Sequence, residues 1–123
     1  MRSAPYIDTE AAVVALLADF TPGTRTPVDL RDRLPYVRIY RIGGTDDGVT
    51  DAAQVAIDVF GVTRAEAWQV ARTVQATMLD RPHATSAGVV DRVRTATGPT
   101  EAPYTDTTIR LVTATYEVQT RRR

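Results

Sequence analysis

The chain has 123 residues, 43% of them hydrophobic and 24% charged, which suits one domain with a hydrophobic core of its own. Fifteen arginines balance fifteen acidic residues, and a net charge of zero argues against a protein that gathers nucleic acid or an acidic membrane by its overall field. There is no cysteine, which excludes disulfides, thiolate metal sites and cysteine nucleophiles.

The first expected element is a helix over residues 9–20. Asp8 is a suitable N-cap, because its carboxylate can accept a hydrogen bond from a free amide of the first helical turn. The apolar positions that recur at helical spacing are Val13, Leu16, Leu17 and Phe20. Pro22, followed by a glycine, ends the pattern because proline cannot continue the hydrogen-bond ladder.

A β-hairpin is expected next. Residues 36–42 and 53–60 are rich in β-branched and aromatic side chains, and the second run alternates apolar with polar positions. The segment 43–48 between them consists of three glycines, two aspartates and a threonine, so we expect a polar, flexible turn region there. The two runs therefore predict an antiparallel pair of strands with a long, exposed tip.

A second helix is expected over residues 64–79. Thr63 and Glu66 have the spacing of a capping box, in which the threonine hydroxyl accepts from the Glu66 amide and the glutamate accepts from the Thr63 amide. One apolar stripe runs along the segment and is made of Ala67, Val70, Ala71, Val74 and Met78. Arg81 and Pro82 close the element. The stripe predicts that one side of this helix packs on a core.

Two more strands are expected in the last third of the chain. The first covers residues 89–96, and a loop through Gly98, Pro99 and Pro103 follows it. The second covers residues 107–120. Its apolar positions alternate, with Ile109 and Leu111 on one face and Val112, Ala114, Tyr116 and Val118 on the other.

The expected order is helix, strand, strand, helix, strand, strand in a single domain that spans residues 1–123. Strands grouped as hairpins between helices predict an α+β fold, with a mostly antiparallel four-stranded sheet and the helices packed on one of its faces. Residues 1–8 and 119–123 are expected to be flexible.

No catalytic or metal-binding constellation is recognisable. His83 is the one histidine, and an exposed loop residue is the favoured interpretation, because a serine so close as Ser86 rarely faces it as a nucleophile. Asp46, Asp47 and Asp51 lack the spacing of a calcium-binding loop. We therefore expect no cofactor, no metal and no enzymatic activity. We interpret the aspartates as an exposed hairpin tip whose charge either keeps the protein soluble or meets arginines of a neighbouring subunit.

Three arginines on expected strands leave two interpretations open. Arg92 and Arg94 share one face of a strand, and Arg110 joins them or not depending on register. Such side chains suit either a surface that faces another subunit or one that follows a phosphate backbone. The nearby acids Asp91 and Asp106, with the balanced net charge, favour the subunit-facing surface.

Aromatic residues complete the candidates. Trp68 lies one position off the apolar stripe of the second helix, where it either completes the edge of the core or anchors a partner protein. Tyr36 and Tyr40 lie on one face of the first strand, which favours core packing over a platform for stacked bases. The candidate assembly interface is made of Asp46, Asp47, Asp51, Trp68, Arg92, Arg94 and Arg110.

Four segments of the chain follow the order of a known family. They are residues 35–44 (PYVRIYRIGG), 53–61 (AQVAIDVFG), 64–71 (RAEAWQVA) and 113–119 (TATYEVQ). With this order of strand, Gly-Gly tip, strand, helix and final strand, the chain resembles the small tail terminator proteins of long-tailed, siphovirus-type bacteriophages. The shared patterns contain no catalytic signature.

The resemblance implies a structural protein of the virion, located in the tail or neck and assembled in the host cytoplasm. It implies a ring, typically a hexamer, that caps the head-proximal end of the tail tube, stops its polymerisation and offers a surface for joining the head. The implied partners are copies of the chain itself, the tail tube protein and the head-tail connector proteins, with no membrane and no specific nucleic acid. A connector or head-completion protein of the neck is the alternative, and a nucleic-acid-binding α+β domain is a further one.

Overall fold

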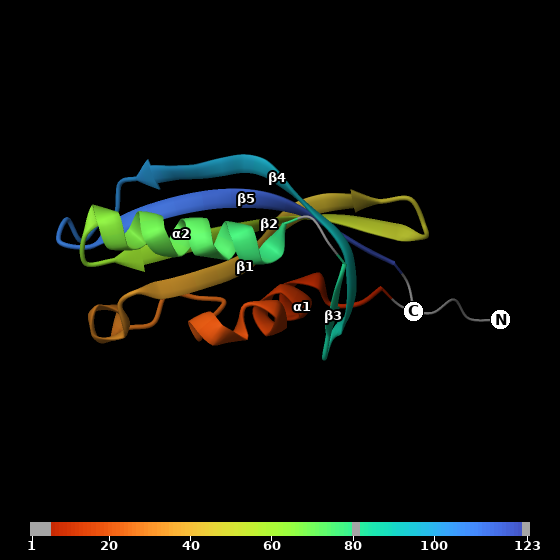
Figure 1. Ribbon diagram of the computed structural model, residues 1–123, viewed down its shortest axis with the longest axis horizontal. Helices are drawn as coiled ribbons and strands as arrows, with labels where there is room; N and C mark the ends of the chain where they lie inside the picture. The colour runs from red at the N-terminus through yellow and green to blue at the C-terminus, as the bar shows by residue number, and fades with distance from the viewer. Residues whose placement is uncertain (1–5, 80–81, 122–123) are drawn as a thin grey trace.

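The computed structural model describes residues 6–79 and 82–121, and it contains one five-stranded sheet in the order β1-β2-β5-β4-β3. The strands are β1 (Tyr36–Asp46), β2 (Thr50–Gly61), β3 (His83–Thr85), β4 (Gly88–Ala102) and β5 (Arg110–Arg121), and each neighbouring pair is antiparallel. The helices α1 (Thr9–Leu16) and α2 (Arg64–Met78) lie on one side of this sheet (Figure 1). The α+β class and the antiparallel sheet are confirmed, whereas four strands is wrong because the short β3 adds a fifth.

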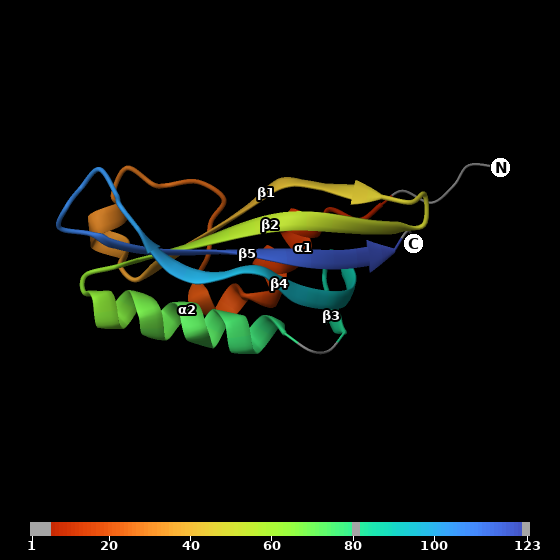
Figure 2. The same cartoon turned by 90° about the horizontal axis from the view of Figure 1, so that it is seen from above.

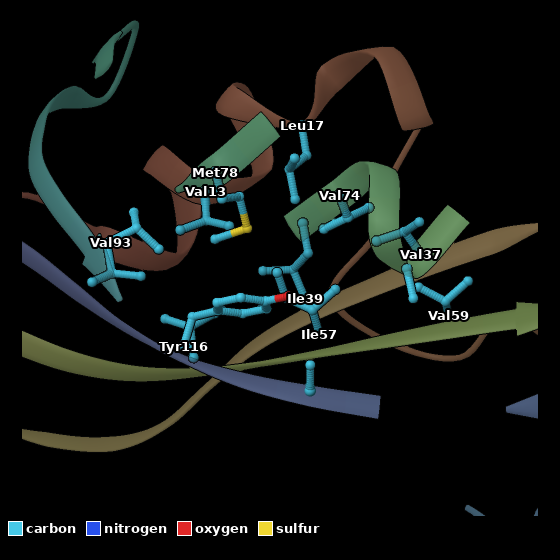
Figure 3. Close-up of a cluster of buried hydrophobic side chains, with 14 of the residues drawn as sticks. Val13, Leu17, Val37, Ile39, Ile57, Val59, Val74, Met78, Val93 and Tyr116 are labelled. Atoms are coloured by element: carbon cyan, nitrogen blue, oxygen red, sulfur yellow. The ribbon is translucent and has the colours of Figure 1, made fainter. Parts of the chain in front are cut away.

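Both helices bury their apolar sides against the same face of the sheet. Val13 of α1, Leu17 directly after it, and Val74 and Met78 of α2 gather around Tyr116 of β5, which is 1% exposed (Figure 3). The alternation expected along β5 is confirmed, because its buried apolar positions are Val112, Ala114, Tyr116 and Val118. Helical spacing on α2 and strand alternation on β5 therefore position one continuous core.

In the part of the chain that the structure describes, no α-helix covers the opposite face of the sheet (Figures 1 and 2). Arg38, Asp58 and Thr113 lie side by side on it, across β1, β2 and β5. Asp58 is 3% exposed and accepts hydrogen bonds from Arg38 Nε at 3.0 Å and from Thr113 Oγ1 at 2.6 Å. Arg38 also donates to Thr26 Oγ1 at 2.6 Å, so the long loop before β1 is attached to this face.

A second, smaller apolar cluster closes one end of that face. Its buried members are Leu30, Tyr36, Phe60 and Ile109. Leu30 belongs to η2 (Leu30–Arg33), a 3-10 helix of the same long loop, and Tyr36 donates from its hydroxyl to the carbonyl of Arg25 at 2.9 Å. The core-packing interpretation therefore holds for Tyr36, while Tyr40 lies on the open face with the Arg38 guanidinium 5.0 Å from its ring centroid.

The β1–β2 hairpin extends farther than the sequence predicts. Its strands remain paired as far as Asp46 and Asp51, so the turn region expected over residues 43–48 is wrong for residues 43–46, and the turn is confined to residues 47–49. The glycines that suggested a turn instead permit the pairing. Gly44 has a φ of 129°, and a Cβ there would lie 2.3 Å from the carbonyl oxygen of Ala52. The hairpin therefore projects beyond the helices as paired strand (Figure 2).

β4 continues through Gly98 and Pro99, where a loop is expected. Irregular register between Thr95 and Thr100 absorbs the extra residues as bulges. Proline is tolerated there because β3 pairs with β4 only over residues 88–90, so this part of β4 is an edge of the sheet. The sequence signals for a turn at Gly98 and Pro99 thus mark bulges in an edge strand.

The capping signals mostly match the structure. The Asp8 carboxylate accepts from an amide of the first turn of α1, and Thr63 Oγ1 accepts from the Glu66 amide at 3.1 Å. The Glu66 carboxylate accepts from the amide of Val62 at 2.9 Å, one residue earlier than the capping-box pattern predicts. The first helix is shorter than expected because residues 18–20 form a 3-10 helix, η1. Among the described residues, neither helix is long and apolar enough to cross a membrane.

The segments expected to be flexible are only partly described. Ile7 is buried in the main core, and Asp8 caps α1. Residues 119–121 belong to β5, and Thr120 is fully buried. Residues 1–5 and 122–123 of the expected flexible ends lie outside the described residues.

Candidate functional site

The described side chains that could perform chemistry do not converge on one centre. Within residues 6–79 and 82–121, no three histidine or acidic side chains lie close enough to hold a metal ion. His83 begins β3, is half-buried, and donates from Nε2 to the carbonyl of Met78 at 2.9 Å, so it differs from the exposed loop residue that we expected. Ser86 lies in the exposed turn after β3. The His83 side chain therefore connects the start of β3 to the end of α2.

The two aspartates at the hairpin tip are exposed, and both form the turn itself. Asp47 Oδ1 accepts from the amides of Val49 at 2.9 Å and Thr50 at 2.7 Å. Asp46 Oδ1 accepts from the amide of Gly48 at 3.1 Å. The hydrogen bonds that the backbone amides of Thr50 and Val49 donate lower the pKa of Asp47 below its ordinary value of 3.8. The carboxylates thus order the tip and still present negative charge to solvent.

Replacing Asp47 by alanine is expected to speed amide hydrogen exchange at Val49 and Thr50, because both amides lose their acceptor. In the unchanged chain the protection of these two amides, measured against the intrinsic exchange rate at each pH, should fall below about pH 4, since stability from a carboxylate with a lowered folded pKa is lost as the pH falls through that pKa. Asp32→Ala is the matched control, because Asp32 is exposed and makes no ion pair among the described residues. Equal exchange in both variants would contradict the assigned role of Asp47.

Asp51 does not belong to the exposed tip. It is 4% exposed, and its two oxygens accept from the two terminal nitrogens of Arg41 at 2.8 Å each. Thr9 Oγ1 lies 3.3 Å from Asp51 Oδ2 and 3.4 Å from the hydroxyl of the buried Thr120. The bonds with Asp51 raise the pKa of Arg41 above its ordinary value. Asp51 therefore fixes the hairpin to α1 and β5, and its carboxylate is used within the chain.

The structure brings two of the three candidate arginines together. Arg92 and Arg94 lie opposite Gln119 and Glu117 of β5, on the sheet face without helices. Arg94 donates to Glu117 Oε1 at 2.6 Å, and this bond is the main reason that the pKa of Glu117 is lowered. Arg110 lies seven residues before Glu117 on β5, roughly 23 Å away along the strand. Arg92 and Arg94 thus form one patch, and Arg110 is not part of it.

Trp68 completes the edge of the core, which is the first of the two roles that its position suggests, and its role as an anchor for a partner protein stays a prediction. Its ring packs against the main core, and the guanidinium groups of Arg64 and Arg72 lie 5.6 Å and 5.4 Å from its ring centroid. Arg64 also forms an ion pair with Glu101 of β4, 2.8 Å apart. The indole Nε1 is buried without a hydrogen-bond acceptor in the described chain. Trp68 therefore forms a rigid patch between α2 and the edge strand β4.

The candidate residues lie in separate parts of the fold. Asp46 and Asp47 are at the end of the β1–β2 hairpin, whereas Trp68, Arg92 and Arg94 are on α2 and β4. Such a distribution does not form one reactive centre, and the candidate residues belong to separate surfaces of the protein.

The family model for phage tail termination proteins matches residues 5–123. The chain belongs to the phage tail termination protein family. The match confirms the family that the sequence resembles. This tail termination protein is therefore a structural component of the phage virion. A search of curated proteins found no match.

The fold of the tail termination protein is also found in a solved virion. A chain in the structure of the native gene transfer agent particle matches with a TM-score of 0.60 and 14% identity, over 89% of this chain and 84% of that chain. At this identity the match shows a shared fold.

Sequence reasoning missed the charged residues outside the hairpin and strands. Asp19 on η1 and Asp32 on η2 are exposed and make no ion pair among the residues described, and Arg72 on α2 has no acidic partner there. No motif marks such residues, because their lack of partners becomes visible only once the intra-chain ion pairs are known.

Proposed function

We propose that this tail termination protein forms a ring, a hexamer by its family resemblance, at the head-proximal end of the tail tube. There it ends tube polymerisation and provides the surface for joining the head. The match of the family model over residues 5–123 carries this proposal. The proposed partners are further copies of the chain, the tail tube protein and the head-tail connector proteins.

A ring gives this role a simple physical basis. Contacts between unlike surfaces of identical subunits close into a ring when the rotation between neighbours divides the circle. A closed ring has two unlike faces, so one can cover the growing end of the tube while the other remains available to the neck. The candidate surfaces for these contacts are the hairpin tip with Asp46 and Asp47, the Trp68 patch, and Arg92 and Arg94.

The test is a tube-growth assay with purified tail tube protein. Tubes grown with increasing amounts of the tail termination protein are expected to become shorter in negative-stain images, because each capped end stops adding subunits. Bovine serum albumin at equal concentration is the control for crowding. Unchanged tube lengths, combined with binding to isolated heads, would instead favour a connector or head-completion protein of the neck.

A further inference from the structure

We infer that copies of this protein associate with one another through two oppositely charged flanks of the sheet, so that the acidic flank of one copy contacts the basic flank of the next. The acidic flank lies beside β1, and its exposed unpaired acids include Asp19 and Asp32. The basic flank lies beside β4, and its unpaired arginines are Arg72 and Arg92. This inference rests on the proposed function and names the surfaces through which the ring would close.

The charges that remain after intra-chain pairing are separated along the sequence. Seven ion pairs join arginines and acids within the described chain. The described acids outside these pairs are Asp8, Glu10, Asp19, Asp32, Asp46, Asp47 and Glu66. The described arginines outside them are Arg25, Arg72, Arg92 and Arg110. With the exceptions of Glu66 and Arg25, the unpaired acids precede residue 60 and the unpaired arginines follow it.

The sheet order turns this separation in sequence into a separation in space. Because the order is β1-β2-β5-β4-β3, the chain up to residue 61 supplies one side of the sheet and the later chain supplies the other. The loop that carries η1 and η2 runs beside β1, where Gly23 donates to the Val37 carbonyl at 3.0 Å. β4 and β1 lie on opposite sides of the molecule in both views (Figures 1 and 2). A chain with no net charge therefore carries a charge asymmetry across its strands.

Strand addition is hindered at both edges, so side chains must carry the contact. On β1, the Gly23 amide donates to the Val37 carbonyl and the Gly23 carbonyl accepts from the Ile39 amide, so these edge groups are already bonded. The Glu10 carboxylate accepts from the Arg41 amide at 3.0 Å. On β4, bulges and Pro99 interrupt the regular edge. Charged side chains remain exposed on both flanks, as Arg92 and Asp32 illustrate.

The signs of the two flanks select the type of contact. Two acidic flanks repel each other, as do two basic flanks, whereas an acidic flank attracts a basic one. A symmetric dimer that joins like flanks is therefore disfavoured. A contact between the unlike flanks of two copies, which can close into a ring, is favoured. Since exposed charges are screened over about 8 Å at physiological ionic strength, self-association should weaken as salt is added.

Two charge-reversal variants test the inference. One carries Arg72→Glu and Arg92→Glu, which makes both flanks acidic, and the other carries Asp19→Arg and Asp32→Arg, which makes both flanks basic. Each alone is expected to self-associate about tenfold more weakly than the unchanged chain. An equimolar mixture should recover association, because every contact then joins an acidic flank to a basic one. The two unaltered flanks pair as in the unchanged chain, and the two altered flanks pair with their charges exchanged. Light scattering coupled to size exclusion at low salt measures this.

The control and the contradicting outcomes are defined by the same design. Arg25→Glu removes an unpaired arginine beside the acidic flank, makes that flank more acidic and should not weaken association, and thermal unfolding checks that every variant folds. Arg92→Glu alone replaces the double variant if the loss of Arg72 from the Trp68 ring impairs folding. Three outcomes would each overturn the inference. The folded variants could associate as strongly as the unchanged chain, or their mixture could fail to recover association. The unchanged chain could also stay monomeric both at low salt and on tubes.

The same samples separate this inference from the proposed function. If the unchanged protein shortens tubes while the mixture of variants neither associates nor shortens them, the inferred contact between the two flanks is wrong and the capping role stands. If the unchanged protein associates as described but never affects tubes, the capping role is wrong and the flanks stand.

Discussion

Replacing Tyr116 by alanine is expected to lower the free energy of unfolding by about 3–5 kcal/mol, the range found for large aromatic side chains removed from a core. Tyr116 is 1% exposed on β5 and lies where side chains of both helices meet the sheet (Figure 3). The cavity left by the ring cannot be filled by either helix alone, because each is held by its own contacts. Urea denaturation measures the change.

Tyr116→Phe is the matched control, since it keeps the ring and removes only the hydroxyl. Burial raises the pKa of Tyr116 to about 12, above its ordinary value of 10.0, so the hydroxyl is neutral at physiological pH. Because the folded pKa lies above the unfolded one, this group stabilises the fold fully below about pH 10, and that contribution is lost as the pH rises toward 12. The phenylalanine variant should lack this component. Equal losses of stability in both variants at pH 7 would contradict the packing role of the ring.

Replacing Asp58 by alanine is expected to cost about 2–3 kcal/mol of stability, because it leaves the partly buried Arg38 without its acid and Thr113 without its acceptor. The side chains of Arg38 and Asp58 are 26% and 4% exposed, so solvent can replace only part of what is lost. The same change should release the loop before β1, since Arg38 also holds Thr26. Thermal unfolding and amide exchange in residues 24–33 measure the two effects.

Asp29→Ala provides the contrast for Asp58. Asp29 pairs with Arg33 at 2.9 Å on the surface, where the two side chains are 45% and 56% exposed, and such pairs contribute about 1 kcal/mol or less. A variant at Asp29 that destabilises the protein as much as one at Asp58 would show that the open face of the sheet does not depend on the buried acid.

The elements that local sequence determines could be predicted. α2 follows from Thr63 as its cap and from an apolar stripe at helical spacing, and both signals lie within the helix itself or next to it. The shared face of Arg92 and Arg94 follows from strand alternation. Neither conclusion requires knowledge of the rest of the chain.

The features that depend on distant partners could not be predicted. The glycines before Asp46 indicate a turn locally, but pairing with β2 keeps them in a strand. Asp51 looks like an exposed loop residue in the sequence, and Arg41 and Thr9 bury it. β3 has only three residues and no pattern of its own, so its pairing with β4 determines it.

The same distinction applies to the candidate assembly interface. Residue type identified Trp68 and the arginines as candidates, because both are enriched at protein interfaces. Their separation from the aspartates of the hairpin tip required the sheet order, which no local pattern contains. The separation of unpaired charges likewise required the ion pairs of the folded chain.

The most direct test of the account is to image tail tubes grown in the presence of this protein with a gold label at its N-terminus. We predict label at one end of each shortened tube, with a ring visible in end-on views. Label spread along the tube walls, or tubes of unchanged length with no label at either end, would contradict the proposal that the protein ends tube growth.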